Sequence, residues 1–222
     1  MKKLVFIITI IIIAISGCKK HTVIEQSDFS MKLGNIYCSD GSIVDPKTYQ
    51  RNGLNNGVGV IFWINPNDSI EDKAFVVSLE DLPSCQWMDE NELQSTAVTT
   101  LTNSFDGASN TDILQFFMQE NEVILKATLE ATGYECQAIK SWYLPSVGQL
   151  LEINRNKEIV YESFKACGGQ PFDNVWYWSS NEDNAGMQSK LYNAFTVSLT
   201  EGRIMALRKS YFAGVRPVKS IK

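Results

Sequence analysis

The stretch Ser141–Ile153, SWYLPSVGQLLEI, constrains the local structure more than any other part of the chain. Pro145 disfavours a helical conformation for the residue before it, so an extended segment must end there. Ser146 and Gln149 have the spacing of a capping box, in which each side chain bonds the backbone N–H of the other residue. The leucines and isoleucine that follow form one apolar stripe. This stretch predicts an extended segment that passes directly into an amphipathic helix.

Residues 1–17 are typical of an export signal. Two lysines precede the apolar run Leu4–Ile15, and small residues then lead to Cys18, as in a bacterial lipoprotein cleavage box. The run is shorter than the roughly 20 residues of a membrane-spanning helix. We expect residues 1–17 to be removed, Cys18 to carry lipid, and residues 18–32 to form a tether. An uncleaved signal anchor is the alternative, which the small residues before Cys18 disfavour. The expected address is the bacterial outer membrane, and the sequence leaves the periplasmic and surface-exposed faces both open.

The charge and the histidine content exclude several functions. The net charge is −5, which argues against nucleic acid as a partner and against membrane contact other than through the lipid. His21 is the only histidine and lies in the tether. A Ser/His/Asp or Cys/His centre, or a histidine-rich metal site, is therefore not expected in the folded part. We assign no cofactor.

Four cysteines remain after Cys18: Cys38, Cys85, Cys136 and Cys167. An even number in an exported protein is consistent with two disulfides, in any of three pairings. Four buried thiols that act as small apolar residues are the equal alternative. No spacing is that of a zinc ribbon.

The apolar patterns predict strands, then helices, then strands again, which is an α+β order in one domain, residues 33–222. The first and last strands are expected to pair. Residues 80–105 are predicted to be loop, anchored by Trp87. Strands are predicted over residues 36–38, 58–64, 73–79, 175–179, 193–199, 204–207 and 211–218. Helices are predicted from Asn110 or Thr111 towards Gly133, from Ser146, and over residues 156–166 with a glycine at the end.

Three phrases, WYLPSVGQL, YWSSNE (Tyr177–Glu182) and GVRPV (Gly214–Val218), follow one another in an order that resembles the C-type-lectin-like fold family. The similar branch includes bacterial exported proteins and the C-terminal domain of collagen-like adhesins. More distantly, the formylglycine-generating enzyme and phage tropism determinants are similar. The resemblance covers roughly residues 33–219. It implies one domain with a twisted antiparallel sheet and two or three helices, in which Arg216 pairs with a buried carboxylate, Glu152 being the candidate.

In the tropism-determinant relatives the C-terminal strands and loops carry the binding residues, and the corresponding span here is residues 181–212. Part of it is expected to be an exposed, oxygen-rich loop, for which a merely solvated loop is the alternative. Calcium-mediated sugar binding is not implied, because Trp178-Ser179-Ser180 stands where calcium-binding lectins have Trp-Asn-Asp, and no metal is expected. By positional analogy, the expected ligand-binding residues are Asn181, Glu182, Asp183, Asn184, Gln188, Lys190, Tyr192, Arg203, Arg208 and Tyr211.

The expected function is non-catalytic binding of a glycan or of an envelope or host protein, in adhesion or as a fimbria-associated component. No catalytic residue is assigned, because no pair of carboxylates is singled out by spacing and no glycine-rich phosphate loop precedes a helix. Two alternatives stay open. One is a structural or assembly component of the periplasm that binds another envelope protein, and the other is an enzyme that uses exposed carboxylates or a cysteine on the same fold.

Overall fold

The structure is a computed structural model that describes residues 31–51, 56–67, 72–93, 104–172 and 175–222. The predicted signal peptide, Cys18 and residues 19–30 of the tether lie outside these ranges and stay predictions. Within them, no helix has both the length and the apolar character needed to cross a membrane.

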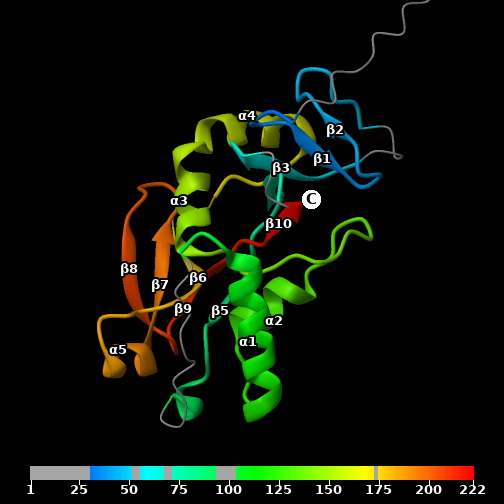
Figure 1. Ribbon diagram of the computed structural model, residues 1–222. Helices are drawn as coiled ribbons and strands as arrows, with labels where there is room; N and C mark the ends of the chain where they lie inside the picture. The colour runs from blue at the N-terminus through cyan, green and yellow to red at the C-terminus, as the bar shows by residue number, and fades with distance from the viewer. Residues whose placement is uncertain (1–30, 52–55, 68–71, 94–103, 173–174) are drawn as a thin grey trace, which may run out of the picture.

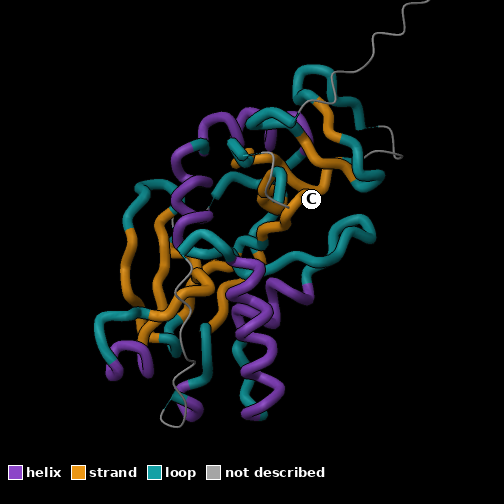
Figure 2. The backbone as a smooth tube through the Cα atoms, in the orientation of Figure 1, coloured by secondary structure: helices purple, strands orange, loops and turns teal. Residues whose placement is uncertain are grey.

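The described part of the chain is α+β, as predicted, but it contains two sheets rather than one (Figures 1 and 2). The first sheet has the order β10-β4-β3-β1-β2 and is antiparallel throughout. Its strands are β1 (Ile36–Cys38), β2 (Ile43–Val44), β3 (Gly57–Ile64), β4 (Ala74–Ser78) and β10 (Val218–Ile221).

The second sheet has the order β5-β9-β6-β7-β8. It is antiparallel except between β6 and β9, where Tyr177 is paired in parallel with Gly214. Its strands are β5 (Leu82–Gln86), β6 (Trp176–Glu182), β7 (Asn193–Ser198), β8 (Ile204–Arg208) and β9 (Phe212–Val215).

Strand β3 lies in the middle of the first sheet and is apolar on both faces. Val60 and Phe62 pack into an apolar cluster with residues of the third and fourth helices, Val147–Arg155 and Lys157–Cys167. Val58 and Ile61 pack on the other face, against Trp142. A continuous apolar run is the pattern of a strand that is buried on both sides.

Five α-helices occur in the described ranges, where two or three were predicted. They are α1 (Gly107–Asn121), α2 (Lys126–Gly133), α3 (Val147–Arg155), α4 (Lys157–Cys167) and the short α5 (Met187–Tyr192); a 3-10 turn, η1, spans Glu90–Glu92. The start of α3 is as predicted: Gln149 N donates to Ser146 Oγ at 3.3 Å, and Ser146 N donates to Gln149 Oε1 at 3.0 Å. The predicted glycine also ends α4, where Gly168 has a φ of +81°.

Other boundaries were wrong. Helix α1 begins at Gly107 with Asp106 as its cap, not at Asn110 or Thr111, which are buried one turn further on. The reason lies in α3: Gly107 N donates to Gln149 Oε1 at 3.2 Å, so the start of α1 is pressed against the cap of α3. Residues 80–105, predicted to be loop, contain β5 and η1, and helix α5 was not predicted.

The last predicted strand is two strands in two sheets, and the expected pairing of the first and last strands was wrong, because β10 pairs with β4. The break occurs at Pro217, where the chain crosses from the second sheet to the first. Proline lacks the N–H that would donate a hydrogen bond to a neighbouring strand. Arg216 is fully buried at this crossing and donates to Ser78 O at 3.0 Å, Asp81 Oδ1 at 2.8 Å and Gln170 O at 3.1 Å.

The carboxylate partner of Arg216 is therefore Asp81 and not the predicted Glu152. Asp81 lies between β4 and β5, where the chain makes its other passage between the sheets. Glu152 instead pairs with Arg155, one helical turn along α3.

Candidate functional site

Three of the predicted ligand-binding residues are buried, so the expected exposed loop was wrong for them. Asn181, Glu182 and Asp183 are between 4% and 6% exposed, because β6 extends to Glu182. Asn181 Oδ1 accepts from Val147 N at 2.9 Å, and Asp183 Oδ2 accepts from Ser189 Oγ at 2.6 Å. These side chains hold helices α3 and α5 in place.

Glu182 forms a buried ion pair with Lys209. Lys209 Nζ also donates to Lys190 O at 2.7 Å and lies 4.7 Å from the centre of the Trp87 ring. Burial lowers the pKa of Lys209, and the negative charge of Glu182 opposes that shift. Lys209 was a further candidate for ligand binding within residues 181–212, and that expectation was wrong, because its side chain is fully buried and joins α5, β6 and the segment before η1.

The other predicted residues do not form one surface. Arg203 lies where the β7–β8 turn enters β8, pairs with Glu201 and stacks over Trp176. Arg208, at the other end of β8, pairs with Glu90 and stacks over Tyr192. Tyr211 lies near Arg208, since its N donates to Arg208 O at 2.8 Å. Gln188, Lys190 and Tyr192 belong to α5, and Asn184 lies between β6 and α5.

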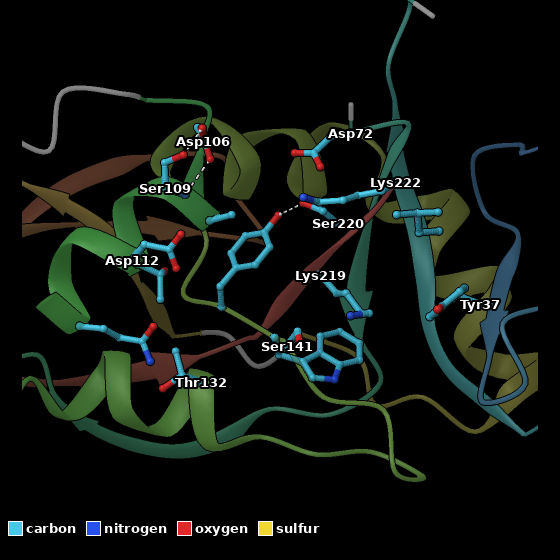
Figure 3. A pocket seen from close by; sticks show the side chains of 16 residues that line it. Tyr37, Asp72, Asp106, Ser109, Asp112, Thr132, Ser141, Lys219, Ser220 and Lys222 are labelled. Atoms are coloured by element: carbon cyan, nitrogen blue, oxygen red, sulfur yellow. Dashed lines mark hydrogen bonds between the residues drawn. The ribbon is translucent and has the colours of Figure 1, made fainter. Parts of the chain in front are cut away.

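A large groove lies elsewhere, between α1, the end of β10 and the segment before α3 (Figure 3). Its volume is about 1070 Å³. None of the ten predicted ligand-binding residues lines it. The walls consist mainly of carboxylates, hydroxyls and two lysines: Asp72, Asp106, Asp112, Ser109, Thr111, Thr132, Ser141, Ser220, Lys219 and Lys222.

The first two turns of α1 form one wall of the groove. Asp106 Oδ1 accepts from Ser109 N at 2.9 Å, and its Oδ2 accepts from Ser109 Oγ at 2.7 Å. Thr111 Oγ1 donates to Leu144 O and accepts from Leu144 N, both at 3.2 Å. Asp112 is exposed on the same turn, next to the opening. This wall is thus fixed by capping bonds while presenting negative charge.

Tyr143 lines the groove beside Ser220. Its hydroxyl accepts from Gln149 Nε2 at 3.0 Å and lies 3.1 Å from Ser220 Oγ. Its backbone N donates to Val218 O at 2.9 Å. Burial raises the pKa of Tyr143, so the phenol stays neutral at ordinary pH and serves as a hydrogen-bonding group.

The opposite wall carries positive charge. Lys219 extends from β10, and its Nζ donates to Lys140 O at 2.8 Å. Burial lowers the pKa of Lys219. The groove therefore has acidic residues of α1 on one side and a partly buried lysine on the other.

Ser141, which lines the groove, has a φ of +64°. Gln137 and Ala138, in the same loop between α2 and α3, also have positive φ values, of 50° and 65°. Non-glycine residues in this region are strained by about 1–3 kcal/mol each, and such strain gathers at functional sites. Three of the four non-glycine residues with positive φ in the described ranges therefore lie in this loop, and Ser141 places it at the edge of the groove.

Of the two equal alternatives, the structure has the free thiols: Cys38 and Cys167 are buried, whereas Cys85 and Cys136 are only partly buried. Burial raises the pKa of Cys85 to about 12 and that of Cys167 to about 11, which disfavours the reactive thiolate. The described residues contain no group of three or more histidine, cysteine or acidic side chains placed to hold a metal ion.

Sequence signals for the groove existed but did not point to a site. Trp142 and Tyr143 belong to the WYLPSVGQL phrase, which predicted the fold rather than a site, and the groove lies where this segment meets α1 and β10. Only the tertiary fold brings them together. The sequence matches no known protein-family model, and no curated protein is significantly similar to it.

Proposed function

We propose that this chain is a lipid-anchored protein of the bacterial outer membrane whose folded part binds a glycan or a protein without catalysis. The lipoprotein-type leader supports the address. The groove beside Tyr143 is the proposed binding site. An enzyme is the less favoured alternative, because Asp106 is occupied in capping α1 and the phenol of Tyr143 is held neutral.

A C-type-lectin-like fold is part of this proposal. It is supported by the order of the WYLPSVGQL, YWSSNE and GVRPV phrases. It is also supported by the α+β architecture, in which β1 and β10, near the two ends of the folded part, belong to the same sheet. Because such folds carry sites of many kinds, the function is argued from the groove rather than from the fold.

The observation that carries the proposal is the groove itself. Its volume of about 1070 Å³ is slightly above the roughly 300–1,000 Å³ usual for ligand sites. Carboxylates, hydroxyls and an ammonium group suit a ligand rich in hydroxyls and amides, such as an oligosaccharide. The strained backbone at Ser141 is consistent with a rim kept for binding.

A glycan array with the soluble domain, residues 22–222, tests the proposal, and it should be run with and without calcium. Asp112→Arg places a bulky, oppositely charged side chain at the groove, whereas Glu120→Arg makes the same charge change farther along α1, outside the lining. We expect binding that survives calcium removal and is lost in Asp112→Arg only. Equal loss in both variants would refute the groove as the site. Loss on calcium removal would overturn the expected absence of a metal.

A protein partner is the second candidate, and one observation favours it. Tyr211 and Phe212 are 57% and 69% exposed at the end of the second sheet that also carries α5. Paired exposed aromatics are typical of protein interfaces. The assembly role would be favoured by two results together. The domain would bind no glycan on the array, and the wild type, but not Phe212→Ser, would capture one envelope protein.

A further inference from the structure

Cys38 and Cys167 lie in one apolar cluster although they are far apart in the sequence. Cys38 is the last residue of β1 and is fully buried, and Cys167 is the last residue of α4 and is 5% exposed. Both belong to the apolar cluster that also contains Ile36, Val60 and Phe164. The end of the first strand thus faces the end of the fourth helix.

Gly57 provides the space between the two cysteines. It is paired with Cys38 across the β1–β3 ladder. A Cβ built on Gly57 would lie 3.1 Å from the Cβ of Cys167 and 2.8 Å from Cγ2 of Ile36. Since Ile36 and Cys38 are two residues apart on one strand, their side chains share a face, and Cys167 packs against that face.

The position of Gly57 relates the two cysteines to each other. Side chains directly opposite in an antiparallel pair have Cβ atoms about 4.5–5.5 Å apart. The vacant Cβ position of Gly57 therefore lies near both cysteines, and a disulfide requires Cβ atoms about 3.5–4.5 Å apart. Burial is the main cause of the raised pKa of Cys167, and the charge of a Cys38 thiolate adds to it.

The remaining cysteines are less well placed. Cys85 packs in a different cluster, near Lys126 and Glu130. Cys136 lies beside Tyr134 and Glu80, but it shares with Cys167 the lining of a cavity of about 150 Å³. Cys136 is thus the rival partner of Cys167, while Cys85 has none in the described ranges.

We propose that Cys38 and Cys167 are joined by a disulfide in the exported protein, while Cys85 and Cys136 stay thiols. In the structure the two thiols contact backbone carbonyls instead, Cys38 Sγ at 3.9 Å from Ile36 O and Cys167 Sγ at 3.1 Å from Ser163 O. Thiols are weak donors, so rotating both side chains away from these carbonyls sacrifices little. The bond ties the first strand to the end of α4.

The oxidant is a disulfide of the exchange type, such as oxidised glutathione or an oxidised dithiol protein. One cysteine thiolate attacks it to form a mixed disulfide and releases half of the reagent as a thiol. The second cysteine then displaces the other half. Two electrons and two protons pass to the reagent, which leaves as two thiols. Because both side chains are buried in the folded protein, the exchange takes place during folding.

The test uses the full chain with Cys18→Ala, which removes the lipidation site but no cysteine of the folded domain. The protein is unfolded, refolded with reduced and oxidised glutathione, alkylated and digested without reductant. We expect one cross-linked peptide pair, Cys38 with Cys167, and alkylated Cys85 and Cys136. Oxidation should raise the urea midpoint of this protein and of a Cys85→Ala/Cys136→Ala variant, but not that of a Cys38→Ala variant.

Four alkylated cysteines after refolding, or a Cys136–Cys167 cross-link, would overturn the proposal. The proposal rests on the exported address, so the wild type should also be alkylated in intact cells. The same cross-link in cells supports both the pairing and the address. A bond that closes in buffer but is absent from cells overturns the address and leaves the pairing standing.

Discussion

Replacing Lys209 with methionine should destabilise the fold by about 3–5 kcal/mol, because it leaves the buried Glu182 carboxylate without its ion-pair partner. The Lys209 side chain is 0% exposed and that of Glu182 is 3% exposed. Methionine keeps most of the apolar stem, so little packing over Trp87 is lost. The bond from Nζ to Lys190 O, at 2.7 Å, is lost as well. The loss of unfolding free energy therefore measures the lost interactions of the Lys209 ammonium group, chiefly the ion pair, rather than the creation of a cavity.

A matched control is available on α4, where Lys165 pairs with Glu162 and both side chains are 72% exposed. Lys165→Met makes the same chemical change in solvent and should cost no more than about 0.5 kcal/mol. The double variant Glu182→Leu/Lys209→Met removes both charges. It should recover much of the loss, since buried ion pairs can often be replaced by apolar residues at little cost.

The assay is urea unfolding followed by tryptophan fluorescence, with the free energy of unfolding taken from midpoint and slope. A double-mutant cycle over Glu182 and Lys209 gives the coupling between them. If Lys209→Met cost less than about 1 kcal/mol, or no more than Lys165→Met, the pair would not be holding α5 against β6, and the reasoning would fail.

Three further predictions concern other parts of the fold, each measured by urea unfolding. Arg216→Met should cost about 3–5 kcal/mol, because Asp81 loses its ion-pair partner and keeps only the hydrogen bond from Tyr177. Glu152→Gln should cost under about 1 kcal/mol, and equal costs would contradict the assigned pair. Gly59→Ala should cost about 1–3 kcal/mol, because the new Cβ would lie 2.6 Å from Val77 O. Gly133→Ala should be neutral or stabilising, because its new Cβ would have no neighbouring atom within 4 Å. Hydrogen bonds from Arg208 and Ser210 lower the pKa of Glu90 from 4.5 to about 2, so its contribution to stability is complete above pH 4.5 and is lost as the pH falls towards 2. Glu90→Gln should reduce the loss of stability over that range, and an unchanged pH profile would show that the pair contributes nothing.

The parts of the fold that could be predicted depend on neighbours in the sequence. The capping box of α3 needs only Ser146 and Gln149, three positions apart, and the structure has it as predicted. Gly168 ends α4 for the same kind of reason, because a positive φ at a helix end favours glycine. The continuous apolar run of β3 likewise specified a buried strand.

The errors arise where distant residues decide. Strand β5, LPSCQ, has little apolar pattern, and it forms because β9 lies beside it at the far end of the sequence. Helix α1 begins at Gly107 because Gln149 of α3 accepts its N–H. The partner of Arg216 is Asp81 because both lie where the chain crosses between the sheets, a relation that sequence spacing does not express.

The predicted binding residues illustrate the same limit at the level of function. A run of acidic and amide side chains, Asn181 to Asn184, has the same composition whether it faces a ligand in solvent or an internal cation. The deciding partner is Lys209, 27 positions beyond Glu182, whose pairing turns the run into the end of a buried strand. The groove was missed for the converse reason, since its polar residues come singly from several segments that only the fold assembles around Tyr143. A site built from one segment can be sought by composition, whereas this groove could be found only from the structure.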